Sequence, residues 1–148
     1  MTDAAPLDVV VVMDPIEAIK TTKDSSFAML LEAQRRGHRL HYVRPGGLAL
    51  RGARAVATAA PLAVRDVQGS YFTLGDWQEL EFGPGQAVLM RKDPPVDADY
   101  LHDTQLLGMA QRQGARVVND PQGLRDFNEK LAAPLFPQCR PPTLVSRA

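Results

Sequence analysis

The sequence lacks the features that would place it in several specialised classes of protein. It contains one cysteine, Cys139, so no disulfide can form within the chain, and the prolines around it and the absence of a nearby histidine predict an unreactive thiol. No apolar run reaches the roughly 18 residues that a membrane-spanning helix needs. The acidic start, with Asp3 and Asp8, lacks the basic segment of a signal peptide. These absences predict a cytoplasmic protein that does not enter a membrane.

An excess of charge of one sign is also missing. The 148 residues include 17 Lys plus Arg and 17 Asp plus Glu, so no basic footprint for nucleic acid is indicated. Aromatic residues make up 6% of the chain, and Trp77 is more typical of cover for a sheet than of a base-stacking platform. The 45% of hydrophobic residues is enough for a real core in one domain. The expected partner is a small molecule or a protein, not nucleic acid.

The first part of the chain has the pattern of a strand, a helix and a second strand. Residues 7–13 form a nearly continuous β-branched run, typical of a strand buried on both faces in a parallel sheet. Asp24 or Ser25 can cap a helix that stops at Gly37. A second strand is expected over residues 39–43, ended by the Pro-Gly-Gly that follows. A right-handed crossover would join these elements.

The rest of the first 120 residues predicts the remainder of an α/β domain. Residues 48–80 carry short apolar clusters between Gly, Pro, Asp and Arg, which indicates short antiparallel strands, as an insertion at the sheet edge. A buried strand is expected over 87–90, a helix from Asp97 or Asp99 to Gly114, and a short strand over 116–119. The predicted fold over 1–120 is α/β, an open, mostly parallel sheet with helices on both faces.

Residues 121–148 predict the incomplete start of a second domain. Asp120 can cap helical turns over 121–130, with proline at the first helical position. A proline-rich link then leads to a strand expected over 143–145, with no further strand after it in the sequence.

Charged and hydroxyl side chains gather where the buried strands should end. Arg91 follows one predicted strand and Asp14 follows another, and the helix that begins near Ser25 and Ser26 starts beside them, with Lys23 close by. Ligands bind at the carboxyl edge of open α/β sheets, and a helix N-terminus favours a carboxylate or phosphate. The hypothesis is an anion site at this edge. The alternative that these side chains only stabilise the fold stays open, because Asp24 can cap its own helix and Asp14 can pair with Lys23 or Arg91.

The other candidate groups indicate no site. His38 and His41 lie three residues apart in a strand region, so they point to opposite faces, and His102 is isolated on a helix. The glycines at 46–47 and 83–85 match neither the dinucleotide fingerprint nor the phosphate loop.

Four segments resemble one known family. Val-Met-Asp-Pro at 12–15, the run from Lys23 to Gly37, Met-Arg-Lys-Asp-Pro-Pro at 90–95 and Leu-Arg-Asp-Phe-Asn-Glu-Lys-Leu at 124–131 are similar to the bacterial type of glutathione synthetase. The resemblance runs from about residue 8 to the end. It implies a pre-ATP-grasp, Rossmann-like domain over 1–120 and the beginning of an ATP-grasp domain over 121–148.

The resemblance also implies an activity for the complete protein. The family is an ATP-dependent carbon–nitrogen ligase of glutathione biosynthesis that joins γ-glutamylcysteine to glycine, with ATP and Mg²⁺, through an acyl phosphate. It implies an ATP-phosphate contact for Lys130, metal ligands and most catalytic groups beyond Ala148, and a homo-oligomer. The substrate-binding candidates taken from the residues are Asp14, Lys23, Ser25, Ser26 and Arg91. This chain alone is expected to be inactive.

Two alternatives stay open. One is a different ATP-grasp ligase that joins a carboxylate to an amine. The other is a free-standing α/β module that binds a small molecule or a subunit without catalysis. Poor nucleotide binding would favour the module, whereas bare apolar surface over 121–148 would favour a piece of a larger ligase.

Overall fold

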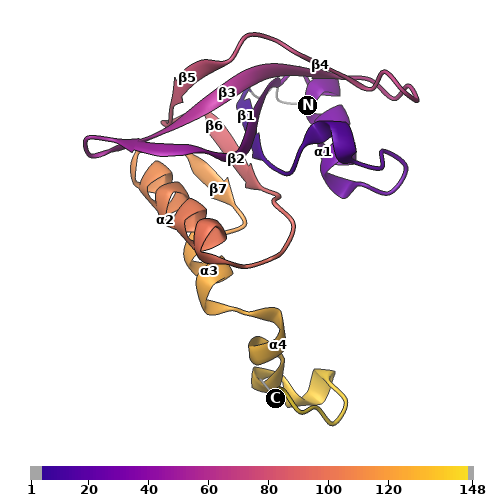
Figure 1. Ribbon diagram of the computed structural model, residues 1–148, viewed down its shortest axis with the longest axis vertical. Coiled ribbons are helices and arrows are strands. Elements are labelled where there is room, and N and C mark those ends of the chain that lie inside the picture. The colour runs from indigo at the N-terminus through magenta and orange to yellow at the C-terminus, as the bar shows by residue number, and fades with distance from the viewer. Residues whose placement is uncertain (1–4, 147–148) are drawn as a thin grey trace.

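The computed structural model describes residues 5–146, and a seven-stranded sheet forms the centre of the fold (Figure 1). The strands lie in the order β4-β3-β2-β1-β6-β7, with β5 also paired to β3. Their bounds are β1 Asp8–Val12, β2 Arg39–Arg51, β3 Arg54–Val64, β4 Phe72–Leu74, β5 Gln78–Glu81, β6 Gln86–Met90 and β7 Arg116–Val118.

One half of the sheet is parallel. Strand β1 lies between β2 and β6, with Val10 opposite His41 and Val88, and β7 adds in parallel beside β6. Residues 9–12 of β1 are buried, as expected for a β-branched run covered on both faces. The carboxyl ends of β1 and β6 therefore emerge side by side at the same edge.

The other half of the sheet is antiparallel, so the pairing is mixed. Strands β3 and β4 lie within the 48–80 region, where antiparallel strands were expected, and β5 ends one residue beyond it; together they form one edge of the sheet. The expectation that the second strand ends at the Pro-Gly-Gly segment is wrong, because β2 continues to Arg51. The register shifts between Val43 and Leu48. Gly46 has a φ of 76°, and a Cβ on Gly47 would lie 2.9 Å from the Arg44 carbonyl oxygen, so the glycines permit a bulge instead of ending the strand.

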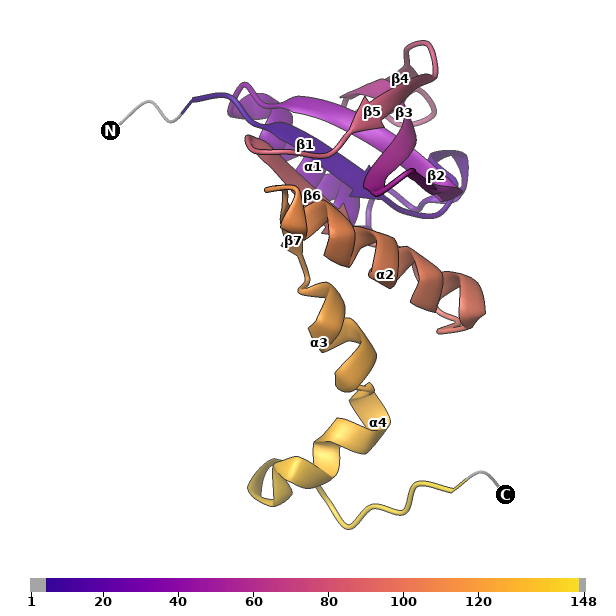
Figure 2. The same ribbon diagram turned by 90° about the vertical axis from the view of Figure 1, so that its left-hand side faces the viewer.

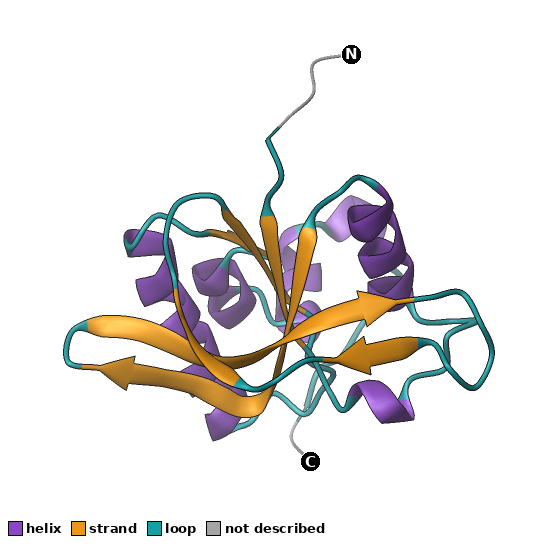
Figure 3. Ribbon diagram, turned by 90° about the horizontal axis from the view of Figure 1, so that it is seen from above, coloured by secondary structure: helices purple, strands orange, loops and turns teal. Residues whose placement is uncertain are grey.

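Helices cover both faces of the sheet, as predicted (Figure 3). Helix α1 (Ser25–Arg35) packs Phe27 and Leu30 against Val9 and Val11 of β1. Helix α2 (Ala98–Arg112) covers the opposite face, where Leu107 and Ala110 join the cluster that contains Val10 and Val12. The alternation of the β1 side chains thus divides the core into two layers.

The predicted helix boundaries follow from identifiable caps. The Asp24 carboxylate accepts a hydrogen bond of 2.8 Å from the Phe27 amide, and Asp97 accepts one of 2.9 Å from the Tyr100 amide. Gly37 and Gly114 have φ values of 82° and 103° just after the two helices, as left-handed stops require.

The segment after β7 leaves the sheet (Figure 2). Helix α3 (Pro121–Asp126) is capped by Asp120 and lies beside α2, and Leu124 packs against the core. The predicted helical turns then break, and Asn128 caps the short helix α4 (Glu129–Ala132). Three short 3₁₀ helices complete the elements: η1 Ile16–Ala18, η2 Ala133–Leu135 and η3 Pro137–Cys139.

The prediction of a strand over residues 143–145 is wrong, because these residues form no helix or strand. No other described strand lies beside them, and a strand needs a partner for its backbone groups. Apolar side chains in this part of the chain are exposed: Phe127, Leu131, Leu135, Phe136, Leu144 and Val145. Cys139 is also exposed. Within residues 5–146, no helix combines the length and the apolar character that crossing a bilayer requires.

Candidate functional site

The carboxyl ends of β1 and β6 and the start of α1 meet at one edge of the sheet. The Arg91 amide donates a 2.8 Å hydrogen bond to the Val12 carbonyl oxygen, which extends the β1–β6 ladder by one residue. Asp14 follows β1 by two positions, and the α1 N-terminus begins at Ser25. The parallel ladder therefore brings Arg91 beside the loop and helix that follow β1, although Arg91 is far from them in sequence.

Arg91 is held by two hydroxyl groups of α1. Its Nε donates to the Ser26 Oγ at 2.9 Å and its Nη2 donates to the Ser25 Oγ at 2.8 Å. Ser26 is buried, whereas Ser25 is exposed. No carboxylate among the described side chains forms an ion pair with Arg91. The guanidinium is thus oriented by neutral oxygens and keeps its positive charge available for an anionic group.

Asp14 is tied to the loop after β6. Its Oδ2 accepts a 2.8 Å hydrogen bond from the Asp93 amide, and its Oδ1 lies 3.8 Å from the Lys92 Nζ. The structural alternative that paired Asp14 with Lys23 or Arg91 is therefore wrong. Lys92 provides the cation nearest to Asp14 instead. It directly follows Arg91 in sequence, and its side chain is only 14% exposed. Arg91 and Lys23 remain unpaired with carboxylates in the described chain.

Two tyrosines, the buried Tyr42 and the partly buried Tyr71, fix the loop that carries Asp14. The Tyr42 hydroxyl donates to the Asp14 carbonyl oxygen and accepts from the Ile16 amide, both at 3.2 Å. The Tyr71 hydroxyl donates to the Ile16 carbonyl oxygen at 2.9 Å. Burial raises the pKa of Tyr42 above its ordinary value of 10.0, so its hydroxyl stays protonated and able to donate.

One small cavity of about 210 Å³ is lined by all of the predicted substrate-binding residues. Four further residues line it: Met13, Ile19, Asp24 and Asp93. The sequence did not single them out, because Met13 and Ile19 are apolar and the two aspartates have the patterns of a helix cap and a turn residue. The predicted residues that share this cavity are Asp14, Lys23, Ser25, Ser26 and Arg91.

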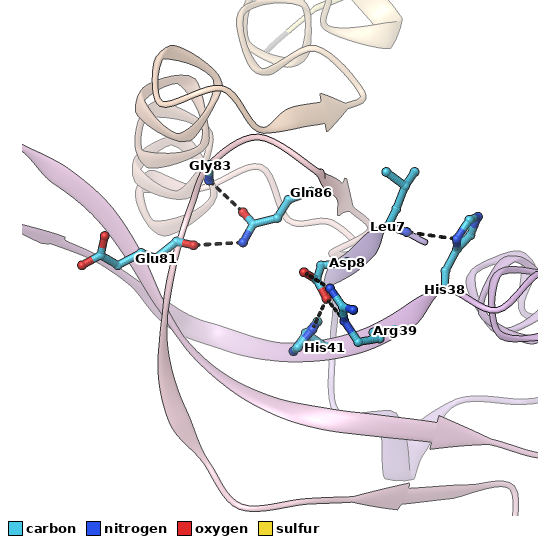
Figure 4. Close-up of polar contacts among 8 residues, drawn as sticks. All are labelled: Leu7, Asp8, His38, Arg39, His41, Glu81, Gly83 and Gln86. Carbon is cyan, nitrogen blue, oxygen red and sulfur yellow. Dashed lines mark hydrogen bonds and ion pairs between the residues drawn. The ribbon is translucent and has the colours of Figure 1, made fainter. Parts of the chain in front are cut away.

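The amino edge of the sheet shows what a purely structural polar cluster looks like in this molecule (Figure 4). Asp8 accepts hydrogen bonds of 2.7 and 2.9 Å from Arg39, and the His41 Nε2 lies 3.0 Å from the Asp8 Oδ1. The His38 Nδ1 accepts from the Leu7 amide at 3.2 Å. Most polar side chains pair with one another here, although the buried His41 Nδ1 has no hydrogen-bond partner among the described residues. The carboxyl edge differs because it keeps a cation without a carboxylate.

Replacing Asp8 by Asn is expected to remove an acid-sensitive part of the stability. Hydrogen bonds from Arg39, followed by His41, hold the pKa of Asp8 at about 2, below its ordinary 3.8. A lowered pKa stabilises the fold above the unfolded value, and this contribution disappears as the pH falls through the folded value. Asp8→Asn should cost about 1 kcal/mol near neutral pH, as for well-formed exposed ion pairs.

Chemical unfolding of both proteins as a function of pH measures this effect. The difference in free energy of unfolding between wild type and Asp8→Asn should disappear as the pH falls from 3.8 towards about 2. The control Asp76→Asn, in an exposed loop, should show no such difference at any pH. A gap that persists at the lowest pH would contradict the assignment.

Lys130 lies outside the edge cavity. It lies on α4 and lines a separate cavity of about 440 Å³ with Arg125 and Asn128. The other wall comes from Pro94 and Val96, in the loop that follows Arg91. One loop thus borders both the cavity at the sheet edge and the cavity that contains Lys130.

The described residues do not fit a metal site. Within residues 5–146, no group of three or more His, Cys, Asp or Glu side chains has an arrangement that could hold a metal ion.

Comparison with known proteins places these features in a family. Residues 7–125 match the family described as "Prokaryotic glutathione synthetase, N-terminal domain". The chain belongs to this family. The match covers the whole sheet, both layers of the core and the edge cavity, which confirms the resemblance drawn from the four sequence motifs.

Relatives named glutathione synthetase extend the comparison. The chain is 75% identical over 141 residues to the protein from Xanthomonas axonopodis pv. citri, covering 95% of this chain and 45% of that protein. Identity is 64% over 142 residues with the protein from Xylella fastidiosa strain Temecula1, covering 96% and 45% of the two chains. With the Yersinia pestis protein it is 48% over 138 residues, covering 93% and 43%. The chain thus spans somewhat less than half the length of these relatives.

Proposed function

We propose that the whole protein is a glutathione synthetase, an ATP- and Mg²⁺-dependent carbon–nitrogen ligase of glutathione biosynthesis, and that this chain supplies part of its peptide-binding side. Family membership and the named relatives support the reaction. The observation that carries the role of this chain is the Arg91 guanidinium, held by Ser25 and Ser26 and paired with no described carboxylate. The peptide substrate, γ-glutamylcysteine, is an anion with carboxylates to offer such a cation.

The proposed reaction has two steps. The cysteinyl carboxylate oxygen of γ-glutamylcysteine attacks the γ-phosphorus of ATP, and ADP leaves, which gives an acyl phosphate. The amine of glycine then attacks the carbonyl carbon and loses a proton, and inorganic phosphate leaves as the new carbon–nitrogen bond forms. ATP and Mg²⁺ supply the activation of the carboxylate. Positive charge near the developing negative oxygens lowers both barriers.

The residues of the edge cavity would bind and orient the peptide. Arg91 can receive a carboxylate through the donors that the serines do not use. The Ser25 and Ser26 hydroxyl oxygens already accept from Arg91, so each hydroxyl hydrogen can donate to the ligand. Lys23 adds a second cation at the exposed rim, and the tyrosine-held Asp14 loop shapes the wall. A cavity of about 210 Å³ fits one end of a dipeptide rather than all of it.

The remaining expectations belong to the whole protein. Lys130 would contact an ATP phosphate from its cavity beside Arg125. The Mg²⁺ ligands would come from outside the described residues. We also propose that the protein acts as a homo-oligomer in the cytoplasm and that the isolated chain is inactive.

An isotope-transfer assay on the whole protein tests the reaction. With ¹⁸O in the cysteinyl carboxylate of γ-glutamylcysteine, together with glycine, ATP and Mg²⁺, glutathione should form and one ¹⁸O should appear in the inorganic phosphate. Glutathione without label in phosphate would overturn the acyl phosphate. ATP turnover with other carboxylate and amine pairs only would favour a different ATP-grasp ligase. Failure to bind ATP would favour a non-catalytic binding module.

A further inference from the structure

A larger cavity lies between α2 and the β2–β3 hairpin. Its volume is about 820 Å³, and it is bounded by Lys92, by the side of α2 that faces the hairpin and, on β2, by Pro45, Gly46, Leu48 and Leu50. Figure 1 shows α2 beside this hairpin. Small-molecule sites typically measure about 300–1,000 Å³. We call this space the α2 cavity. Lys92 separates it from the edge cavity, because its side chain lines the α2 cavity while its Nζ lies 3.8 Å from Asp14.

The walls of the α2 cavity differ in chemistry. Leu48 and Leu50 from β2 and Leu106 and Met109 from α2 supply apolar surface. The first turns of α2 supply carboxylates instead. Lys92 and His102 also line the cavity, and the acidic lining residues are Asp97, Asp99 and Asp103. Such a space suits a molecule with a hydrocarbon part and a cationic head.

Asp103 is the group that points to a ligand. It is only 6% exposed, and within residues 5–146 its carboxylate accepts no hydrogen bond and forms no ion pair. Burial raises its pKa, the nearby Asp99 and Asp97 raise it further, and Lys92 and His102 lower it. The carboxylate lacks a partner in a largely buried position and lines the cavity, so a cation that enters the cavity can form a charged hydrogen bond with it.

Asp99 gives the cation a second contact. Asp99 and Asp103 lie four residues apart on α2, so they share one face of the helix. Asp99 also has no ion pair in the described chain, whereas Asp97 is occupied as the helix cap. The described residues lack the donor arrangement for a metal ion. An ammonium group has three N–H donors and can bridge two carboxylates.

We propose that the α2 cavity binds a small organic amine, with its ammonium group against Asp103 and Asp99 and its hydrocarbon part against Leu48, Leu106 and Met109. This site lies on a different face of the sheet from the proposed peptide site and does not depend on the ligase activity. It is a ligand site additional to the substrate-binding residues proposed above.

Titration of the ¹⁵N-labelled chain with hexylammonium at neutral pH tests the proposal. Amide signals of residues 46–50 and 97–109 should shift and saturate. Hexanoate and hexanol have the same carbon chain with an anionic or neutral head and should produce no saturating shift. Asp103→Asn should weaken hexylammonium binding by about tenfold or more, as loss of one charged hydrogen bond predicts. Asp99→Asn should weaken it less, and Asp66→Asn, on a distant exposed loop, should leave it unchanged.

Three results would overturn the proposal: no saturating shift with hexylammonium, equal binding of hexanol, or unchanged affinity in Asp103→Asn. Because a buried substitution can disturb folding, thermal unfolding of Asp103→Asn accompanies the titration. If that variant does not fold, Asp99→Asn decides, since Asp99 is exposed. Unchanged affinity in this second variant would then count against the site.

Discussion

Arg91→Ala is expected to lower kcat/KM for γ-glutamylcysteine by about a hundredfold in the whole protein. The substitution removes the cation that the structure holds against Ser25 and Ser26. A hydrogen bond to a charged group contributes about 1.5–3 kcal/mol, and each 1.4 kcal/mol is a factor of ten. Steady-state kinetics with the peptide as the varied substrate measures the loss. The KM for ATP should stay close to that of the wild type, because the Lys130 cavity is separate.

Two further variants separate binding from a general structural effect. Arg36→Ala removes an exposed arginine at the end of α1 that pairs with Glu32 and with no other described carboxylate, so its kinetics should match those of the wild type. Arg91→Lys keeps the charge but loses the planar set of donors, so it should recover only part of the activity. If Arg91→Ala leaves both kcat and the peptide KM unchanged, the role assigned to Arg91 is wrong.

Phe27→Ala is expected to lower the free energy of unfolding of the chain by about 3–5 kcal/mol, the usual range for a buried Phe truncation. The Phe27 side chain is 1% exposed and meets the Tyr71 ring edge-to-face, with 5.8 Å between ring centroids. It anchors the first turn of α1, which carries the two serines that hold Arg91. The variant should therefore weaken the peptide site as well as the fold.

Denaturant unfolding provides the measurement for Phe27→Ala. Met29→Ala is the matched control, because Met29 lies on the same helix but is 39% exposed, and its cost should be below about 1 kcal/mol. Equal losses in the two variants would contradict the packing described for α1.

The parallel core could be predicted because its sequence signals are local. The β-branched run of β1, the Asp24 and Asp97 caps and the glycines after both helices each act within a few residues of their own position. These signals were enough to expect two covered faces and a ligand edge. The Pro-Gly-Gly segment misled for the same reason. Its local sequence is typical of the end of a strand, but β2 pairs with β3 on both sides of it, so the segment forms a bulge within the strand.

The partners of the charged groups could not be predicted, because side-chain pairing depends on which segments become neighbours. Asp14 takes Lys92 and the Asp93 amide rather than Lys23, since the β1–β6 ladder brings residues 79 positions apart into contact. The α2 cavity was missed entirely. Asp103 looks like an ordinary helix carboxylate in sequence, and only the packing of α2 beside the β2–β3 hairpin buries it without a partner.

The sequence by itself determined the family, the layered α/β core and five of the nine residues that line the edge cavity, because apolar periodicity, capping and motif spacing are local properties of the chain. Only the tertiary structure decided which of the charges are already paired. Asp8 is satisfied at one edge of the sheet, while Arg91 at the other edge and Asp103 on α2 have no ion-pair partner among the described residues. That distinction depends on distances across the fold, and pairing energies fall too steeply with distance for sequence spacing to reveal them.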